Sequence, residues 1–268
     1  MNNLKVIILA AGEGKRLRPL TKNIPKCMVN FFGKSLLERQ IDIFQNLGIN
    51  DISVVTGYCE NKISIDNIKK FKNKNFSTTN MVESLFTAKE KIDDSVIVAY
   101  GDIVFESKII QKLMNSRHDI SVIIDKNWKD LWKVRFENPL EDAESLILDK
   151  NKLILELGQK EKNINNIQGQ FIGLMKFQNA GINNIINFYE KMKNISNSSM
   201  NPLNPNLPFE KSFMTDFLQG LIQNNHKLNA IIIENGWLEI DSLKDYNLYE
   251  KMNKNKSLKK LISFEEYH

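Results

Sequence analysis

Residues 4–28 read LKVIILAAGEGKRLRPLTKNIPKCM, an apolar run that passes directly into a glycine-bearing loop. The run from Leu4 to Leu9 is typical of a buried strand, and the small residues after it indicate a turn. Gly12 and Gly14 allow unusual backbone angles and the close approach of a phosphate chain to backbone N–H groups. The stretch therefore predicts a strand and a phosphate-holding loop at the start of an α/β fold.

Basic side chains follow within the same loop. Lys15 and Arg16 come next to the second glycine, and Lys26 follows the rigid Pro25. These cations would clamp a triphosphate, with Lys26 reaching the phosphorus under attack. The loop has neither the GxxxxGK[ST] pattern nor the third glycine of a dinucleotide fingerprint, so those two phosphate motifs do not fit. A surface loop with solvated charges is the alternative interpretation.

Composition narrows the class of protein. The chain has 268 residues, 42% hydrophobic and 26% charged, which is typical of a globular fold with one substantial core. The net charge of +5 comes from scattered lysines with no basic stripe among aromatics, so no nucleic acid is expected as a partner. Cys27 and Cys59 have no metal-ligand spacing, and the three histidines lie far apart. With no membrane-length apolar run and no signal peptide, the expected location is cytoplasmic.

The rest of the chain alternates strand and helix patterns. Strands are expected over Val6–Ala10, Ile52–Thr56, Val96–Tyr100, Ile120–Asp125, Gly173–Phe177 and Ala230–Ile233. Helices are expected over Leu36–Leu47, Met81–Lys91, Lys108–Asn115, Ile182–Met192, Thr215–Asn224 and Lys251–Leu261. The alternation predicts a mixed, mostly parallel, doubly wound sheet flanked by helices.

One domain over residues 1–250 is expected, followed by a basic helix or tail over 251–268. Residues 1–125 form its nucleotide-binding half in this interpretation, and residues 126–250 form a less regular half that binds the second substrate. The segment 194–212 contains three prolines and many asparagines and serines, and it predicts a long loop at the site.

Carboxylates follow two apolar runs. Asp102 comes after a strand and Gly101, at the sheet edge where α/β folds favour ligands, although a turn or capping role is an alternative. Asp241 ends the segment WLEID, and it is also placed to cap the helix pattern that begins at Ser242. Glu239 lies two residues earlier and so on the same face of a strand.

The pattern AAGEGKRLRPLT followed by PKCM resembles the signature of nucleotidyltransferases that activate sugar phosphates, G-x-G-x-R-L-x-P-L-T with a later P-K pair. Segments such as NMVESLFTA, VAYGDIVFE, ELGQK, MTDFLQGLI and GWLEIDSLKDYNLY resemble one branch of that family. This branch contains the cytidylyltransferases of phosphocholine and phosphonate chemistry, including those associated with phosphoenolpyruvate mutase. The resemblance reaches about Tyr249 and excludes only loop 194–212 and the tail.

The resemblance implies a single Rossmann-like (GT-A-like) domain that transfers CMP from CTP to a small amino-bearing phosphate or phosphonate and releases pyrophosphate. L-Glutamine phosphate, 2-aminoethylphosphonate and phosphocholine are the implied acceptors, for modification of surface glycans or capsule. Asp102 and Asp241 are implied to hold Mg²⁺, while Lys26 and Arg16 stabilise charge on the phosphates. The implied nucleotide-binding residues are Ala10, Ala11, Gly12, Gly14, Lys15, Asn80, Ser84 and Gly101.

Asn80 and Ser84 lie one helical turn apart, and the resemblance implies that they lie next to the cytosine; an N-cap is the alternative role for Asn80. Lys126, Lys160 and Arg135 are candidates for the acceptor phosphate, and each is alternatively an exposed cation. Partners for an acceptor ammonium group would be Glu239, Glu137 or Asp216, the last also a candidate helix cap. Trp128, Trp132 and Trp237 belong either to the core or to the acceptor pocket.

Two other functions stay open on the sequence. A sugar 1-phosphate enzyme that uses UTP or dTTP is the first, although the proline-rich segment expected of it is replaced here by NMVESL. A nucleotide-binding protein without catalysis is the second. The oligomeric state, including a homodimer, is also open.

Overall fold

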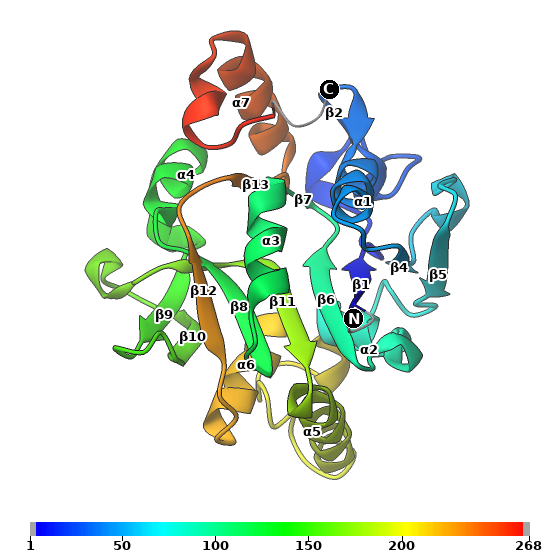
Figure 1. Ribbon diagram of the computed structural model, residues 1–268, viewed down its shortest axis with the longest axis vertical. Coiled ribbons are helices and arrows are strands. Elements are labelled where there is room, and N and C mark those ends of the chain that lie inside the picture. The colour runs from blue at the N-terminus through cyan, green and yellow to red at the C-terminus, as the bar shows by residue number, and fades with distance from the viewer. Residues whose placement is uncertain (1–3, 265–268) are drawn as a thin grey trace.

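The computed structural model describes residues 4–264. A seven-stranded sheet in the order β12-β8-β11-β6-β1-β4-β5 forms its centre (Figure 1). These strands are β1 (Leu4–Leu9), β4 (Asp51–Thr56), β5 (Ile68–Lys72), β6 (Ser95–Tyr100), β8 (Ile120–Asp125), β11 (Gln170–Gln178) and β12 (Asn229–Ile233). Only β11 runs antiparallel to its two neighbours, so the predicted mixed, mostly parallel sheet is confirmed.

Helices cover both faces of this sheet. They are α1 (Leu36–Asn46), α2 (Met81–Thr87), α3 (Ser107–Asn115), α4 (Trp128–Arg135), α5 (Ala180–Ser196), α6 (Met214–Gln223) and α7 (Leu243–Lys254). Alternate side chains of β1 point to opposite faces, since Val6 and Ile8 pack with α1, α3, α4 and α7, whereas Ile7 and Leu9 pack with α2, α5 and α6. Figure 1 shows α3 in front of the sheet and α6 behind it.

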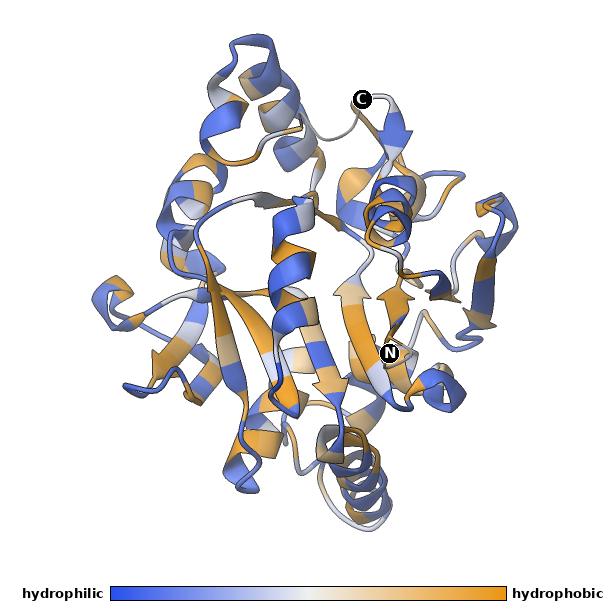
Figure 2. Cartoon of the chain, in the orientation of Figure 1, coloured by the Kyte–Doolittle hydropathy of each residue, from blue (hydrophilic) through white to orange (hydrophobic). Residues whose placement is uncertain are grey.

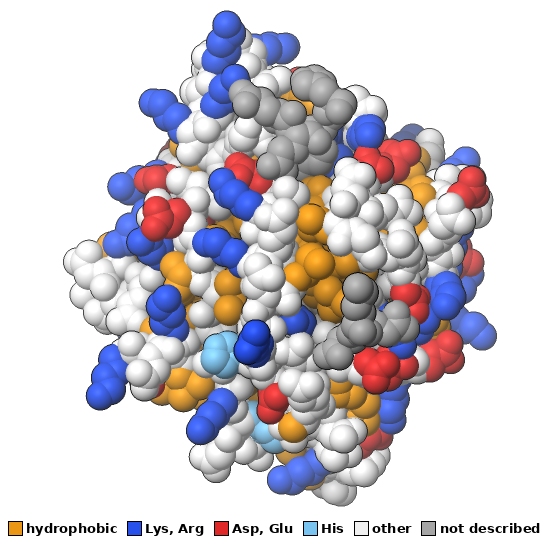
Figure 3. Space-filling view, viewed as in Figure 1, with side chains coloured by type: hydrophobic (Ala, Val, Ile, Leu, Met, Phe, Trp, Pro, Cys, Tyr) orange, Lys and Arg blue, Asp and Glu red, His pale blue; other side chains and the backbone are white. Residues whose placement is uncertain are grey.

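The central strands are hydrophobic along most of their length because both of their faces are covered. Figure 2 shows this for β1, β6 and β8. Trp128, Trp132 and Trp237 are all buried in the core cluster that faces α1, so the core interpretation of the tryptophans is the one that the structure shows. Lys and Arg side chains are spread over the face drawn in Figure 3 rather than gathered into a stripe.

Three two-stranded ribbons complete the fold: β2 (Asn30–Phe31) with β3 (Lys34–Ser35), β7 (Ile103–Phe105) with β13 (Trp237–Glu239), and β9 (Glu144–Leu148) with β10 (Ile154–Lys160). Within residues 4–264, no helix combines the length and the apolar character needed to cross a membrane.

The helix predicted over 251–261 is helical only over 251–254, where it is the end of a helix that starts earlier. Helix α7 starts at Leu243 because the Ser242 side chain accepts from the Asp245 N–H while Asp245 caps in return, and it ends at Lys254. A short 3-10 turn, Ser257–Lys260, follows it. The chain after this turn packs against the domain, where the Gly236 N–H donates to the Leu261 carbonyl at 2.7 Å. The chain after residue 250 thus packs on the same core, with Leu258, Leu261 and Ile262 buried; residues 265–268 of the expected tail lie outside the described residues.

Segment 194–212 is a loop only in part, because α5 continues to Ser196 and a 3-10 turn spans Phe209–Lys211. The loop is attached to the first half of the chain through Asn80, whose N–H donates to the Glu210 carbonyl at 2.8 Å. It therefore borders the region where the sequence predicts the base of the nucleotide.

Candidate active site

The candidate site lies at the carboxyl ends of β1 and β6, two parallel neighbours that end together with Leu9 opposite Tyr100. The Gly101 N–H donates to the Leu9 carbonyl at 2.9 Å, and a Cβ at this position would lie 2.9 Å from the same oxygen. Glycine is therefore required for the chain to turn so close to β1, and the turn brings Asp102 to the sheet edge.

The loop after β1 folds back to place Lys26 at the same edge. Gly14 has a φ of 67°, and a Cβ there would lie 2.9 Å from Lys26 Cβ. The Thr21 hydroxyl donates to the Gly14 carbonyl at 2.7 Å and closes the loop. The loop therefore fixes the stem of Lys26 by direct contact with a left-handed glycine.

The β7–β13 ribbon brings Asp241 to Asp102. Glu239 is opposite Ile103 in this antiparallel pair, and the Ile240 N–H donates to the Asp102 carbonyl at 3.0 Å. Lys26 Nζ lies 2.6 Å from Asp102 Oδ2 and 2.7 Å from Asp241 Oδ1. Arg16 forms an ion pair with the other oxygen of Asp241, so Lys26, Arg16 and both predicted metal ligands meet at one place.

The capping alternative for Asp241 is wrong, because Ser242 is the residue that caps α7. Asp102 does not cap a helix either, since Glu106 occupies the position before α3. Both carboxylates are thus available to cations at the sheet edge.

Opposite charges outweigh burial at this centre. Burial lowers the pKa of the Lys26 ammonium, but the charges of Asp102, Asp241 and Glu239 together raise it above its ordinary value. Burial raises the pKa of the Asp241 carboxyl, but Lys26 and Arg16 bring it below its ordinary value. At neutral pH, Lys26 is therefore a cation and Asp241 an anion.

The carboxylate pair fits a divalent cation. Both side chains converge on one cation position, and the buried Asp102 Oδ1 has no hydrogen-bond partner among residues 4–264. In the described part of the chain, no group of three or more Asp, Glu, His or Cys side chains is arranged so that it could hold a metal ion. Two carboxylates suit Mg²⁺, which commonly takes one or two of them and completes its octahedron with water and substrate phosphates.

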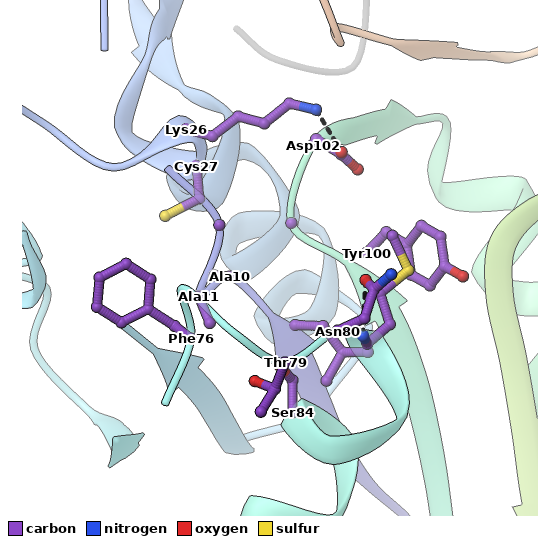
Figure 4. A pocket seen from close by; sticks show the side chains of 14 residues that line it. Ala10, Ala11, Lys26, Cys27, Phe76, Thr79, Asn80, Ser84, Tyr100 and Asp102 are labelled. Atoms are coloured by element: carbon purple, nitrogen blue, oxygen red, sulfur yellow. Dashed lines mark hydrogen bonds and ion pairs between the residues drawn. The ribbon is translucent and has the colours of Figure 1, made fainter. Parts of the chain in front are cut away.

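A cavity of about 130 Å³ opens beside these charges. Figure 4 shows Lys26 and Asp102 on one side of it and Thr79 and Ser84 on the other, with Ala10 and Ala11 between them. Of the predicted nucleotide-binding residues, the cavity is lined by Ala10, Ala11, Gly12, Asn80, Ser84 and Gly101. Gly14 does not line it but supports Lys26, and Lys15 is exposed and paired with Glu13 at 3.5 Å.

Asn80 caps α2, since its Oδ1 accepts from the Met81 N–H at 2.9 Å. Sequence reasoning missed Phe76 and Thr79, which line the cavity from the segment between β5 and α2. Their only sequence signal is their position just before Asn80, because nothing in the pattern of this loop indicates which side chains point inward.

Arg135 was one of three candidates for the acceptor phosphate, with an exposed cation as the alternative, and the structure buries it in ion pairs instead. Its side chain is 1% exposed and forms ion pairs with Glu239 at 2.8 Å and with Asp245 at 3.0 Å. The guanidinium therefore supports Glu239 from behind. Burial raises the pKa of Glu239 to about 7, with the charges of Asp102 and Asp241 adding to the rise and Arg135 opposing it.

A second acidic residue, Glu144 on β9, was missed. Burial raises its pKa to about 7, and the nearby charges of Asp142, Asp216 and Glu239 act in the same direction. Burial also raises the pKa of the Tyr100 hydroxyl, and the negative charges of Glu144, Asp102 and Glu239 raise it further. Tyr100 lines the cavity, and the charges of Glu144 and Glu239 reach it. We call Glu144, Asp142, Asp216 and Glu239 the acidic region, because the last three charges all act on Glu144.

The other acceptor candidates are placed less directly. Asp216 performs the capping role, accepting from the Phe213 N–H at 2.8 Å at the start of α6. Lys160 is exposed at the end of β10, opposite Glu144 in the ribbon. Lys126 is half exposed and pairs with Glu234 at 2.6 Å. Glu137 is exposed, beyond the end of α4.

Several known proteins are similar to this chain in sequence and in fold. Residues 6–143 match the family model of the MobA-like NTP transferase domain. The chain is 39% identical over 255 residues to the CTP:phosphoglutamine cytidylyltransferase of Campylobacter jejuni subsp. jejuni, a match covering 90% of this chain and 97% of the relative. It is 33% identical over 119 residues to the choline-phosphate cytidylyltransferase of Streptococcus pneumoniae, covering 43% of this chain and 52% of that protein.

The solved structure of the CTP:phosphocholine cytidylyltransferase from Streptococcus pneumoniae has the same fold, with a TM-score of 0.71. That match has 21% sequence identity and covers 94% of this chain and all of the other. The fold, the family model and the full-length relative agree. The chain is a nucleotidyltransferase and belongs to the MobA-like NTP transferase family.

Proposed function

We propose that this chain is a CTP-dependent cytidylyltransferase that joins CMP to a small phosphate carrying an ammonium group, with L-glutamine phosphate as the first candidate. The observation that carries the proposal is the position of Lys26, whose ammonium contacts both Asp102 and Asp241 at the mouth of the cavity. The relative that is 39% identical along nearly its whole length supports CTP and a phosphorylated glutamine as substrates.

In this reaction a phosphoryl oxygen of the acceptor attacks the α-phosphorus of CTP. The bond from that phosphorus to the α,β-bridging oxygen breaks, and pyrophosphate leaves with the electron pair. The acceptor oxygen is already anionic, so the chain supplies positioning and charge stabilisation rather than a nucleophile. Lys26 and Arg16 are the cations that would neutralise charge developing on the α-phosphate and on pyrophosphate.

Asp102 and Asp241 would hold Mg²⁺, and the ion would lessen the repulsion between the two anionic substrates. Because Lys26 contacts both carboxylates, it lies within reach of any phosphate oxygen bound at that ion. The base would enter the cavity between Ala11 and Ser84, while the acceptor would approach from the other side of Tyr100.

The acidic region supports an acceptor with a positive group. Glu144, Asp216 and Glu239 influence one another electrostatically, and the only cation paired with them at close range in the described residues is Arg135, on Glu239. A cluster of carboxylates attracts an ammonium group, although it also repels the acceptor phosphate unless that end lies at Lys26. This orients the acceptor with its phosphate toward β1 and its amine toward β9.

The test is pyrophosphate release by the purified chain with Mg²⁺, four nucleotides and a panel of acceptors. The panel contains L-glutamine phosphate, phosphocholine, 2-aminoethylphosphonate and glucose 1-phosphate, and mass spectrometry identifies the product. We expect release with CTP and an amino-bearing acceptor. Release only with UTP or dTTP and glucose 1-phosphate would show that the chain is a sugar 1-phosphate nucleotidyltransferase. No release with any pair of substrates would favour a nucleotide-binding protein without catalysis.

A further inference from the structure

The Ser84 hydroxyl, which lines the cavity, already uses its oxygen as a hydrogen-bond acceptor. Its oxygen accepts from Asn73 Nδ2 at 3.1 Å. Its hydrogen has no acceptor among residues 4–264, and Ser84 is 6% exposed while it lines the cavity. The free role of this hydroxyl is therefore to donate into the cavity.

The orientation of the Asn73 amide is fixed by its other contacts. Asn73 Oδ1 accepts from the Asn75 N–H at 3.0 Å, so the nitrogen must face the opposite way. Asn73 Nδ2 then donates both to Ser84 and to the Thr79 hydroxyl, the latter at 2.9 Å. The Asn73 backbone is itself anchored to β4, because its N–H donates to the Thr56 carbonyl at 2.8 Å.

Thr79 has no hydrogen left to donate to a ligand. Its hydroxyl donates to the Asn75 carbonyl at 3.0 Å and accepts from Asn73. Ser84 and Thr79 thus differ although both line the cavity, since only Ser84 is left with an unused hydrogen.

We propose that Asn73 is a positioning residue for base selection: its amide makes Ser84 a hydrogen-bond donor to N3 of the base, which selects cytosine over uracil. This inference rests on the proposed function and deepens it. N3 of cytosine is an acceptor, whereas uracil carries an N3–H donor that would face the Ser84 donor. A site built to form one hydrogen bond rejects a base that leaves its donor unpaired.

Asn73→Asp tests the inference because it replaces the hydrogen-bond donor that faces Ser84 with an acceptor and hardly changes the shape of the side chain. The new carboxylate still accepts from the Asn75 N–H, but its second oxygen accepts from the Ser84 hydroxyl. The lone pairs of Ser84 then face the cavity and match the N3–H of uracil. Asn183→Asp on the exposed side of α5 adds the same charge far from the cavity and is the matched control.

The measurement is kcat/KM for CTP and for UTP at several pH values. We expect the CTP/UTP ratio of N73D to fall about tenfold or more relative to wild type, with kcat/KM for UTP rising in absolute terms. The ratio should return toward the wild-type value as the pH is lowered and the new carboxyl takes a proton, since it then donates as the amide does. Ser84→Ala should lower kcat/KM for CTP more than for UTP.

If Asn73 had only a structural role, N73D would lower kcat/KM for CTP and for UTP by the same factor. Its melting temperature would then also be lower than that of wild type. The inference is overturned if N73D keeps the wild-type CTP/UTP ratio at every pH, or if S84A does. If wild type itself has no preference for CTP, the proposed function fails rather than the role of Asn73 alone.

Discussion

The carboxylates of Asp102 and Asp241 share one cation, the ammonium of Lys26, at 2.6 and 2.7 Å. The two aspartates lie far apart in the sequence and meet because β7 pairs with β13. This ribbon turns three separate sequence segments into one charged centre, and the centre generates the predictions below.

Replacement of Lys26 by Met removes the cation that contacts both aspartates. Because charge on the phosphates then develops without it, we expect kcat to fall about 100-fold or more. Steady-state pyrophosphate release measures this loss. Lys26→Arg is the comparison that retains the charge, and equal rates for K26M and wild type would remove Lys26 from the reaction.

A metal ion held by Asp102 and Asp241, as proposed, would take the position that the Lys26 ammonium occupies between them. We therefore expect K26M to bind Mn²⁺ without nucleotide at least about tenfold more tightly than wild type. Electron paramagnetic resonance of free Mn²⁺ measures the binding. Adding Asp102→Asn to K26M should abolish the gain, and a gain that survives this change would place the ion elsewhere.

Gly14→Ala tests the contact between the loop and Lys26. Alanine would have to adopt the left-handed backbone angle of Gly14, which is strained for a residue with a Cβ. The added Cβ would also lie 2.9 Å from Lys26 Cβ, so the lysine must shift. We expect lower kcat together with a loss of stability of about 1–3 kcal/mol. In Gly12→Ala the new Cβ meets no described atom within 4 Å, so that variant should melt like wild type, and identical melting of both variants would argue against the contact.

Glu144 makes folding stability depend on pH. Its pKa is about 7 in the folded chain against 4.5 ordinarily, so its contribution is fully present below pH 4.5 and is lost as the pH rises through 7. Glu144→Gln should therefore raise the free energy of unfolding at pH 8 relative to wild type, and by less at pH 5. Urea unfolding at both pH values measures the difference, and a larger gain at pH 5 would contradict it.

Loss of Arg135 should destabilise the fold. Its guanidinium is buried against Glu239 and Asp245, and Arg135→Met leaves both carboxylates without their partner. We expect a loss of about 3–5 kcal/mol in the free energy of unfolding. Arg135→Lys keeps the charge and should lose less, as measured by the same urea method; equal losses would mean that charge is not what matters there.

Local patterns were enough to predict six of the seven strands of the sheet and the loop of Lys26, while the edge strand β5, which is rich in lysine, was missed. Short apolar runs rich in β-branched residues and bounded by turn residues, such as Leu4–Leu9, favour buried strands, and the glycine and proline positions around Lys26 depend on neighbours in sequence. Long-range contacts were beyond such patterns. The burial of Arg135 depends on Asp245, 110 positions away, and that is why the sequence left only an acceptor-phosphate ligand or an exposed cation as its roles.

The environment of Glu144 was likewise unpredictable, because it arises from Asp216 and Glu239 meeting β9 in space. The start of α7 was different. The sequence indicated a helix pattern from Ser242 onward, and the errors were a separate helix after residue 250 and Asp241 as the possible cap, although Ser242 and Asp245 display a capping box.

Transfer of CMP itself is the most direct measurement of the central claim. Phosphorus NMR of a mixture of CTP, Mg²⁺ and L-glutamine phosphate should show a new diphosphate and pyrophosphate appearing in equal amounts, and both should be absent with K26M. Unchanged CTP signals with every amino-bearing acceptor, or turnover by K26M at the wild-type rate, would contradict a cytidylyltransferase built around Lys26, Asp102 and Asp241.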